Sequence, residues 1–264
     1  MEKYYLIVAY VMMGIVGLCV GSFLNVVIYR VPNNMSLATP ASHCPTCKYQ
    51  LRWYDNIPVL SYLMLGGKCR SCKNHISFRY TAVEIINCLF WICCVERFWQ
   101  ASVPMAIIYA LALSTLICVY CIDLEHKIIP DRFHVIILCL AFASLFFDKD
   151  YDLVSHLLGG VIFFFAFYLI GLGFEKAMGR EALGGGDIKL IGAVGLLIGW
   201  ERMLLSILVA TIPAAIIMVI AERISNKTGK SREFPFAPFL VIGFTFSIFF
   251  GKGLIDWYLS LLGL

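Results

Sequence analysis

The chain has 264 residues, of which 61% are hydrophobic and 14% are charged, and its mean hydropathy is +0.84. A soluble domain of ordinary composition carries about 25% charged residues, so this composition excludes a soluble globular protein and indicates a polytopic membrane protein. The formal net charge of +4 suits an anionic inner leaflet and gives no argument for nucleic acid as a partner.

Uncharged apolar runs mark the candidate membrane spans, which need about 20 residues each. Five clear spans cover residues 4–29, 98–122, 153–174, 203–221 and 234–251. A shorter run covers residues 133–147, and weaker candidates cover residues 80–95, 188–200 and 252–264. The last candidate is expected to continue the span before it, in one final helix that starts near Phe236 and runs irregularly to the C-terminus. We therefore expect an all-α, polytopic integral membrane protein with about eight transmembrane helices.

The first run is too long for the apolar region of a cleavable signal peptide, so it is expected to be the first span. The distribution of Lys and Arg then sets the orientation, because cytoplasmic loops retain positive charge. If the loop from residue 30 to residue 79 is cytoplasmic, all but five of the 21 Lys and Arg residues lie on that side; the exceptions are Lys3, Arg97, Lys149, Arg202 and Lys252. With an even number of spans, both termini lie outside a multi-pass protein of the inner (plasma) membrane.

The first cytoplasmic loop contains two CxxC motifs, separated by residues 48–68. Their four cysteines are Cys44, Cys47, Cys69 and Cys72. Two such pairs complete a closed tetrahedral zinc site, in which the ion is structural because no coordination position stays open. Disulfides are the alternative, and a cytoplasmic location disfavours them. We expect a zinc-ribbon-like loop in which the metal orders a segment with little apolar core of its own.

Two aspartates lie at the ends of apolar stretches. Asp123 directly follows the run at residues 98–122, and Asp187 follows three glycines, Gly184, Gly185 and Gly186. An ionisable residue at a membrane boundary is a functional candidate, and a glycine run lets a substrate strand approach the backbone closely. Two carboxyl groups in one partly dry site share a proton, as in an aspartic peptidase. The sequence leaves open that both aspartates are merely solvated charges at helix ends.

Other ionisable residues are weaker candidates. Glu125 and Asp131 are alternatives for the first carboxylate, but Asp131 is better explained as the cap of the following helix and Glu125 as part of a hydrated cluster. Glu84 is expected to be an interfacial or inward-facing charge near a helix start. His134 and His156 show no ligand spacing and are expected to lie at the interface or to be partnered within the bundle.

In its order of motifs, the chain resembles the bacterial type IV prepilin peptidases (leader peptidase/N-methyltransferases), a class of GxGD-type membrane aspartic peptidases. The resemblance covers nearly the whole length. Its elements are Gly21 to Pro32 (GSFLNVVIYRVP), the paired CxxC motifs, Asp123 with Ile129-Pro130-Asp131, and Gly184 to Lys189 (GGGDIK). It implies that Asp123 and Asp187 are the catalytic pair and that Gly184, Gly185 and Gly186 form the substrate-site backbone.

The resemblance also implies a substrate. Members of the family cut the short basic leader from prepilins or pseudopilins at the cytoplasmic face, and many then methylate the new N-terminal amine with S-adenosylmethionine. No glycine-rich nucleotide-binding fingerprint occurs in this chain, so no residue is assigned to the methyl donor. The expected organisation is a first transmembrane helix at 1–29, a cytoplasmic zinc-binding loop at 30–78 and a membrane peptidase domain at 79–264.

An alternative function belongs to another class: a non-catalytic membrane assembly protein that uses the zinc ribbon to dock a cytoplasmic partner. It accounts for the composition and the cysteines equally well, but it requires nothing of Asp123 and Asp187. A zinc-dependent metalloenzyme is not supported, because the sequence contains no HExxH motif and four thiolates would saturate the ion.

Overall fold

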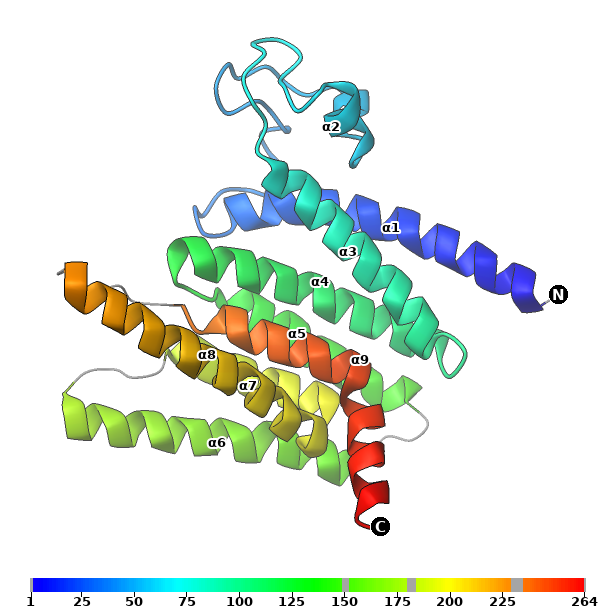
Figure 1. Ribbon diagram of the computed structural model, residues 1–264. Helices are drawn as coiled ribbons and strands as arrows, with labels where there is room; N and C mark the ends of the chain where they lie inside the picture. The colour runs from blue at the N-terminus through cyan, green and yellow to red at the C-terminus, as the bar shows by residue number, and fades with distance from the viewer. Residues whose placement is uncertain (1, 149–151, 180–183, 229–234, 264) are drawn as a thin grey trace. The chain divides into compact units, whose positions relative to one another are not determined.

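The computed structural model describes residues 2–148, 152–179, 184–228 and 235–263 (Figure 1). All regular structure in these ranges is helical. The helices are α1 (Glu2–Arg30), a 3-10 helix (Trp53–Asn56), α2 (Leu60–Met64), α3 (Phe78–Phe98), α4 (Val103–His126), α5 (Asp131–Phe147), α6 (Leu153–Met178), α7 (Gly185–Ile198), α8 (Trp200–Thr228) and α9 (Ala237–Leu261).

Six of these helices are long and apolar enough to cross a membrane, namely α1, α3, α4, α6, α8 and α9. Two apolar helices of 17 and 14 residues, α5 and α7, complete a set of eight. The all-α, polytopic architecture with about eight membrane helices is thereby confirmed. As predicted, the C-terminal segment is one helix, α9; residue 234, where its apolar run begins, lies outside the described ranges.

The chain divides into two compact units, Met1–Cys118 and Val119–Leu264, and α4 contributes residues to both. In the first unit α1 and α3 lie side by side (Figure 1). A Cβ atom on Gly21 would lie 2.8 Å from the Cα atom of Glu84, so this glycine permits the close approach of the two backbones. The buried amide of Asn87 donates to the carbonyl oxygen of Gly17 at 2.7 Å and accepts from the Ser114 hydroxyl at 2.7 Å. These bonds satisfy polar groups that would otherwise be costly in an apolar environment.

The second unit is organised around α7, which packs against α5, α6, α8 and α9. Nine of its 14 residues are buried. At its contact with α6 the two backbones touch, because a Cβ atom on Gly195 would lie 2.1 Å from the carbonyl oxygen of Gly159. The His156 ring nitrogen Nδ1 bonds the carbonyl oxygen of Leu196 at 2.9 Å, so His156 is partnered within the bundle as predicted. These contacts fix α7, whose first turn carries Asp187.

Candidate active site

The carboxyl group of Asp123 lies in the last turn of α4. Its side chain is buried, with only 6% of the residue exposed. The carboxylate accepts a hydrogen bond from the backbone N–H of Ala237, the first residue of α9, and its other oxygen, Oδ2, has no hydrogen-bond partner. A helix N-terminus favours a negative charge, while the unpartnered oxygen leaves one acceptor available to a water molecule or a substrate.

Asp187 is the third residue of α7 and is half-buried. The preceding glycines leave room around it. A Cβ atom on Gly184 would lie 3.2 Å from Oδ2 of Asp187, and one on Gly186 would lie 3.1 Å from the Cβ atom of Ile129, whereas one on Gly185 would have no neighbour within 4 Å. The backbone beside Asp187 is therefore packed on one side and open at Gly185.

The structure brings Asp123 and Asp187 together. Burial and the nearby charge of Asp123 raise the pKa of Asp187 to about 7. Asp187 precedes the apolar run at residues 188–200 and lies outside the six long candidate spans. Such a carboxyl group holds a proton for much of the time at neutral pH, next to a second carboxyl group that accepts a backbone N–H at the start of α9. Two neighbouring carboxyl groups of this kind can act as a general acid and a general base.

A polar network holds the glycine run in place. The buried ring of His134 bonds the carbonyl oxygen of Gly186 through Nε2 at 3.0 Å; because a carbonyl only accepts, Nε2 carries the hydrogen. Its Nδ1 lies 3.5 Å from Oδ1 of Asp131, and the same oxygen accepts from Nζ of Lys189 at 2.7 Å. Lys189 lowers the pKa of the exposed Asp131. The network thus joins the start of α5 to the first turn of α7.

This network corrects the interpretation of Asp131 as a helix cap. The N-cap position of α5 is Pro130, which makes no side-chain cap, and Asp131 is the first helical residue. Its carboxylate pairs with Lys189 instead of the free backbone amides. Glu125, the other alternative to Asp123, is exposed, while Glu84 is buried in α3 as an inward-facing charge.

The four cysteines predicted to bind metal form one cluster. Cys44, Cys47, Cys69 and Cys72 place their Sγ atoms within 4.8 Å of one another. The Cys44–Cys72 and Cys47–Cys69 sulfur pairs are each 3.9 Å apart. A tetrahedral site with Zn–S bonds of about 2.3 Å separates its sulfurs by roughly 3.8 Å, so the donor set fits a single metal ion.

The two CxxC segments fold in the same way. In each, the N–H group of the first cysteine donates to the carbonyl five residues later, and a lysine with positive φ donates back to the carbonyl of that cysteine. The residues are Cys44, Lys48 (φ 59°) and Tyr49 in one segment and Cys69, Lys73 (φ 60°) and Asn74 in the other. The loop is thus built from two equivalent turns that face one another across the sulfur cluster.

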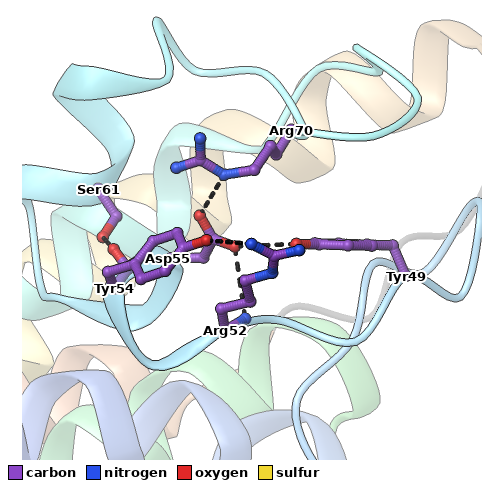
Figure 2. A network of polar contacts seen from close by, with 6 residues as sticks. All are labelled: Tyr49, Arg52, Tyr54, Asp55, Ser61 and Arg70. Atoms are coloured by element: carbon purple, nitrogen blue, oxygen red, sulfur yellow. Dashed lines mark hydrogen bonds and ion pairs between the residues drawn. The ribbon is translucent and has the colours of Figure 1, made fainter.

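A buried carboxylate links these two turns (Figure 2). The Asp55 side chain is fully buried and accepts from Nε of Arg70 at 2.7 Å, where Arg70 belongs to the second CxxC segment. Its other oxygen accepts from the Tyr49 hydroxyl and the Arg52 N–H, both at 3.4 Å. Asp55 is the single acidic residue between positions 30 and 78, and an isolated carboxylate in a basic loop is a sequence signal that marks it as a candidate structural residue.

Comparison with known proteins agrees with these motifs. Residues 15–98 match the family model described as Bacterial Peptidase A24 N-terminal domain, and residues 110–219 match that of the Type IV leader peptidase family. The chain is 36% identical to a prepilin leader peptidase/N-methyltransferase of Myxococcus xanthus, over 84% of this chain and 66% of that protein. It is 32% identical to the protein of the same name from Pseudomonas aeruginosa, over 94% of this chain and 93% of that protein. No solved structure matches. The chain belongs to the type IV leader peptidase family.

Proposed function

We propose that this protein cleaves the leader peptide of type IV prepilins or pseudopilins and methylates the N-terminus that cleavage exposes. Membership of the family and the two activities in the names of its relatives support the proposal. The observation that carries the peptidase activity is the pair of carboxyl groups, Asp123 and Asp187, beside a glycine run with open space at Gly185.

In this proposal the two aspartates have different roles. Asp123, which accepts the Ala237 N–H, is the carboxylate that takes a proton from the attacking water. Asp187, whose pKa is raised to about 7, is the protonated partner that donates to the nitrogen of the scissile amide. Water attacks the carbonyl carbon directly, so no covalent acyl-enzyme forms. The open backbone at Gly185 would receive the extended segment of the substrate.

Two further groups belong to the proposal. We assign a structural zinc ion to Cys44, Cys47, Cys69 and Cys72, whose sulfur spacing fits a tetrahedral site. The ion would order the loop without taking part in the reaction. S-adenosylmethionine would supply the methyl group for the second activity.

The site is proposed to face the cytoplasm. Asp123 lies at the C-terminal end of the third membrane helix and Asp187 at the N-terminal end of the sixth. With alternating helices these two positions lie on the same side of the bilayer as the loop between α1 and α3. The excess of Lys and Arg on that side supports a cytoplasmic location.

The test is cleavage of a prepilin that carries its leader, in membranes that contain the wild type, Asp123→Asn or Asp187→Asn. Each substitution removes one half of an acid/base pair, so the rate should fall about 10²–10⁴-fold at unchanged protein level. The matched control is Asp256→Asn, an exposed carboxylate in α9, which should cleave like the wild type. Cleavage that survives both substitutions would reject the dyad and favour the docking-protein alternative. A further gain of one methyl group in the intact mass of the product would support the second activity.

A further inference from the structure

A cavity with a few polar side chains in its lining lies within the first unit. It has a volume of about 260 Å³ and is lined by residues of α1, the cysteine loop and α3, between Ser22 and Glu84. A second cavity of about 390 Å³ adjoins it. The lining residues that the two share are Ser22, Val26, Arg30, Ser42 and Asn56. Small-molecule sites occupy about 300–1,000 Å³, so the combined space suits a ligand of nucleoside size.

One wall of the cavity carries an unmatched acceptor. Asn25 is buried, with 7% exposed, and its Nδ2 donates to the carbonyl oxygens of Gly21 at 3.3 Å and Tyr80 at 3.0 Å. Those two acceptors fix the orientation of the amide. Its Oδ1 is then left buried without a hydrogen-bond partner, which costs about 1–3 kcal/mol unless a ligand supplies a donor.

The same cavity contains a buried carboxylate. Glu84 is 8% exposed and accepts from the Val59 N–H at 2.8 Å and from the Ser22 hydroxyl. Within the described ranges no cationic side chain pairs with it. Arg30 also lines the cavity, but its guanidinium group donates to the backbone carbonyls of the adjacent loop at 2.8, 3.3 and 2.5 Å. A buried carboxyl group without a cation favours its neutral form, and a positively charged ligand would stabilise the carboxylate here.

Aromatic residues complete the lining, namely Tyr29, Tyr62 and Tyr80. The guanidinium group of Arg79 already lies over the Tyr80 ring, and the aromatic side chains add a flat, apolar part to the lining. A ligand that suits this cavity therefore carries a positive charge, N–H donors and a flat, apolar part. S-adenosylmethionine has all three, with a sulfonium and an ammonium group, an amino group on adenine, and the adenine ring itself.

We propose that this cavity is the S-adenosylmethionine site, with Glu84 supplying the negative charge and Asn25 the acceptor. The inference rests on the proposed N-methyltransferase activity. All the lining residues lie within residues 15–98, the range matched by the N-terminal family model. The aspartate pair lies in the other unit and in the range of the other family model. The two activities would therefore use separate sites.

The test measures binding of radiolabelled S-adenosylmethionine to the purified full chain in lipid nanodiscs, by equilibrium dialysis. Glu84→Gln removes the charge but keeps an oxygen that accepts the Val59 N–H, so the fold is retained; affinity should fall at least tenfold while leader cleavage is unchanged. The matched control is Glu96→Gln, on the exposed surface of the same helix, where the carboxylate accepts from the Tyr10 hydroxyl. It should bind like the wild type.

A second measurement locates the site independently of any variant. Ultraviolet cross-linking of the labelled donor to the wild type should label a peptide within residues 19–84. Wild-type affinity in Glu84→Gln, or cross-linking to a peptide beyond residue 118, would overturn the inference. Asp123→Asn and Asp187→Asn should bind the donor normally. A chain that cleaves but does not bind the donor rejects this site alone, whereas one that binds at this site but does not cleave rejects the peptidase proposal alone.

Discussion

Burial and the neighbouring carboxyl group of Asp123 both favour the protonated form of Asp187. Because its pKa is raised to about 7, the carboxyl group keeps its proton below that value and loses it above. We expect the rate of leader cleavage to fall as the pH rises from 7 to 9, approaching a tenfold loss per unit. The observed midpoint belongs to the pair, since the two groups titrate together. Initial rates between pH 5.5 and 9 test this, and a rate that stays constant to pH 9 contradicts it.

His134 provides a second prediction at this scale. His134→Leu leaves the carbonyl oxygen of Gly186 without its hydrogen-bond donor. The lost bond destabilises the native position of the glycine run by about 1 kcal/mol. Leader cleavage should slow about fivefold in kcat with little change in KM, since the residue positions the site without contacting the substrate. His134→Gln retains an N–H donor and should recover part of the rate. Equal rates in Leu and Gln variants would show that the hydrogen bond is irrelevant to positioning.

Single site residues could be predicted from the sequence, whereas the residues that lie next to them in the fold could not. Asp123 and Asp187 were selected because each stands at the edge of an apolar run, which is a local property. Their proximity is not local, since it depends on how α7 packs among four other helices. Asn25 was overlooked for a related reason: it lies in an ordinary apolar run, and its unmatched oxygen appears only after α3 is packed against α1.

Among the elements, the contact of α6 with α7 is the most sensitive to added volume. A Cβ atom at residue 195 would overlap the carbonyl oxygen of Gly159, so Gly195→Ala must push the two helices apart. Overpacking of this kind costs about 1–3 kcal/mol, and it would also displace Asp187. We expect a lower thermal midpoint and slower cleavage. The control is Gly173→Ala in α6, where a Cβ atom meets nothing within 4 Å; its midpoint should not fall. Equal midpoints for the two variants would contradict the close contact.

The cysteine loop provides the second prediction for an element. Cys69 is buried within the sulfur cluster, so Cys69→Ser should abolish binding of the proposed zinc ion and unfold the loop between residues 42 and 76. The measurements are metal content by mass spectrometry and limited proteolysis of that segment. Cys139→Ser, at an exposed position in α5, is the control and should keep both properties. Full zinc content in Cys69→Ser would refute the four-cysteine site.

The residue at which a helix ends cannot be predicted from composition alone. The uncharged run that predicted the third span stops at residue 122, yet α4 continues to His126. The helix dipole does not explain the extra turn, because acidic residues such as Asp123 and Glu125 are unfavourable at a helix C-terminus. The helix ends where Lys127, with φ 55°, donates its N–H to the carbonyl oxygen of Asp123. An apolar run measures the membrane, whereas hydrogen bonding and capping set where a helix stops. The predicted division of the chain at residues 29 and 78 rests on the limits of apolar runs, and it stays a prediction.

For the whole molecule, topology decides whether the two proposed activities are possible at all. In the proposed topology of eight membrane helices, both termini lie outside, and the loop after α1, the end of α4 and the start of α7 lie inside. We expect a reporter active only outside the cytoplasm, such as alkaline phosphatase, to be active when fused after residue 264 and inactive when fused after residue 50. A green fluorescent protein fused at the same two points should give the opposite pattern. The reverse result would expose the cysteines to an oxidising compartment, where a disulfide is favoured over a metal site. It would also place Asp123 and Asp187 on the side away from a leader that has not left the cytoplasm.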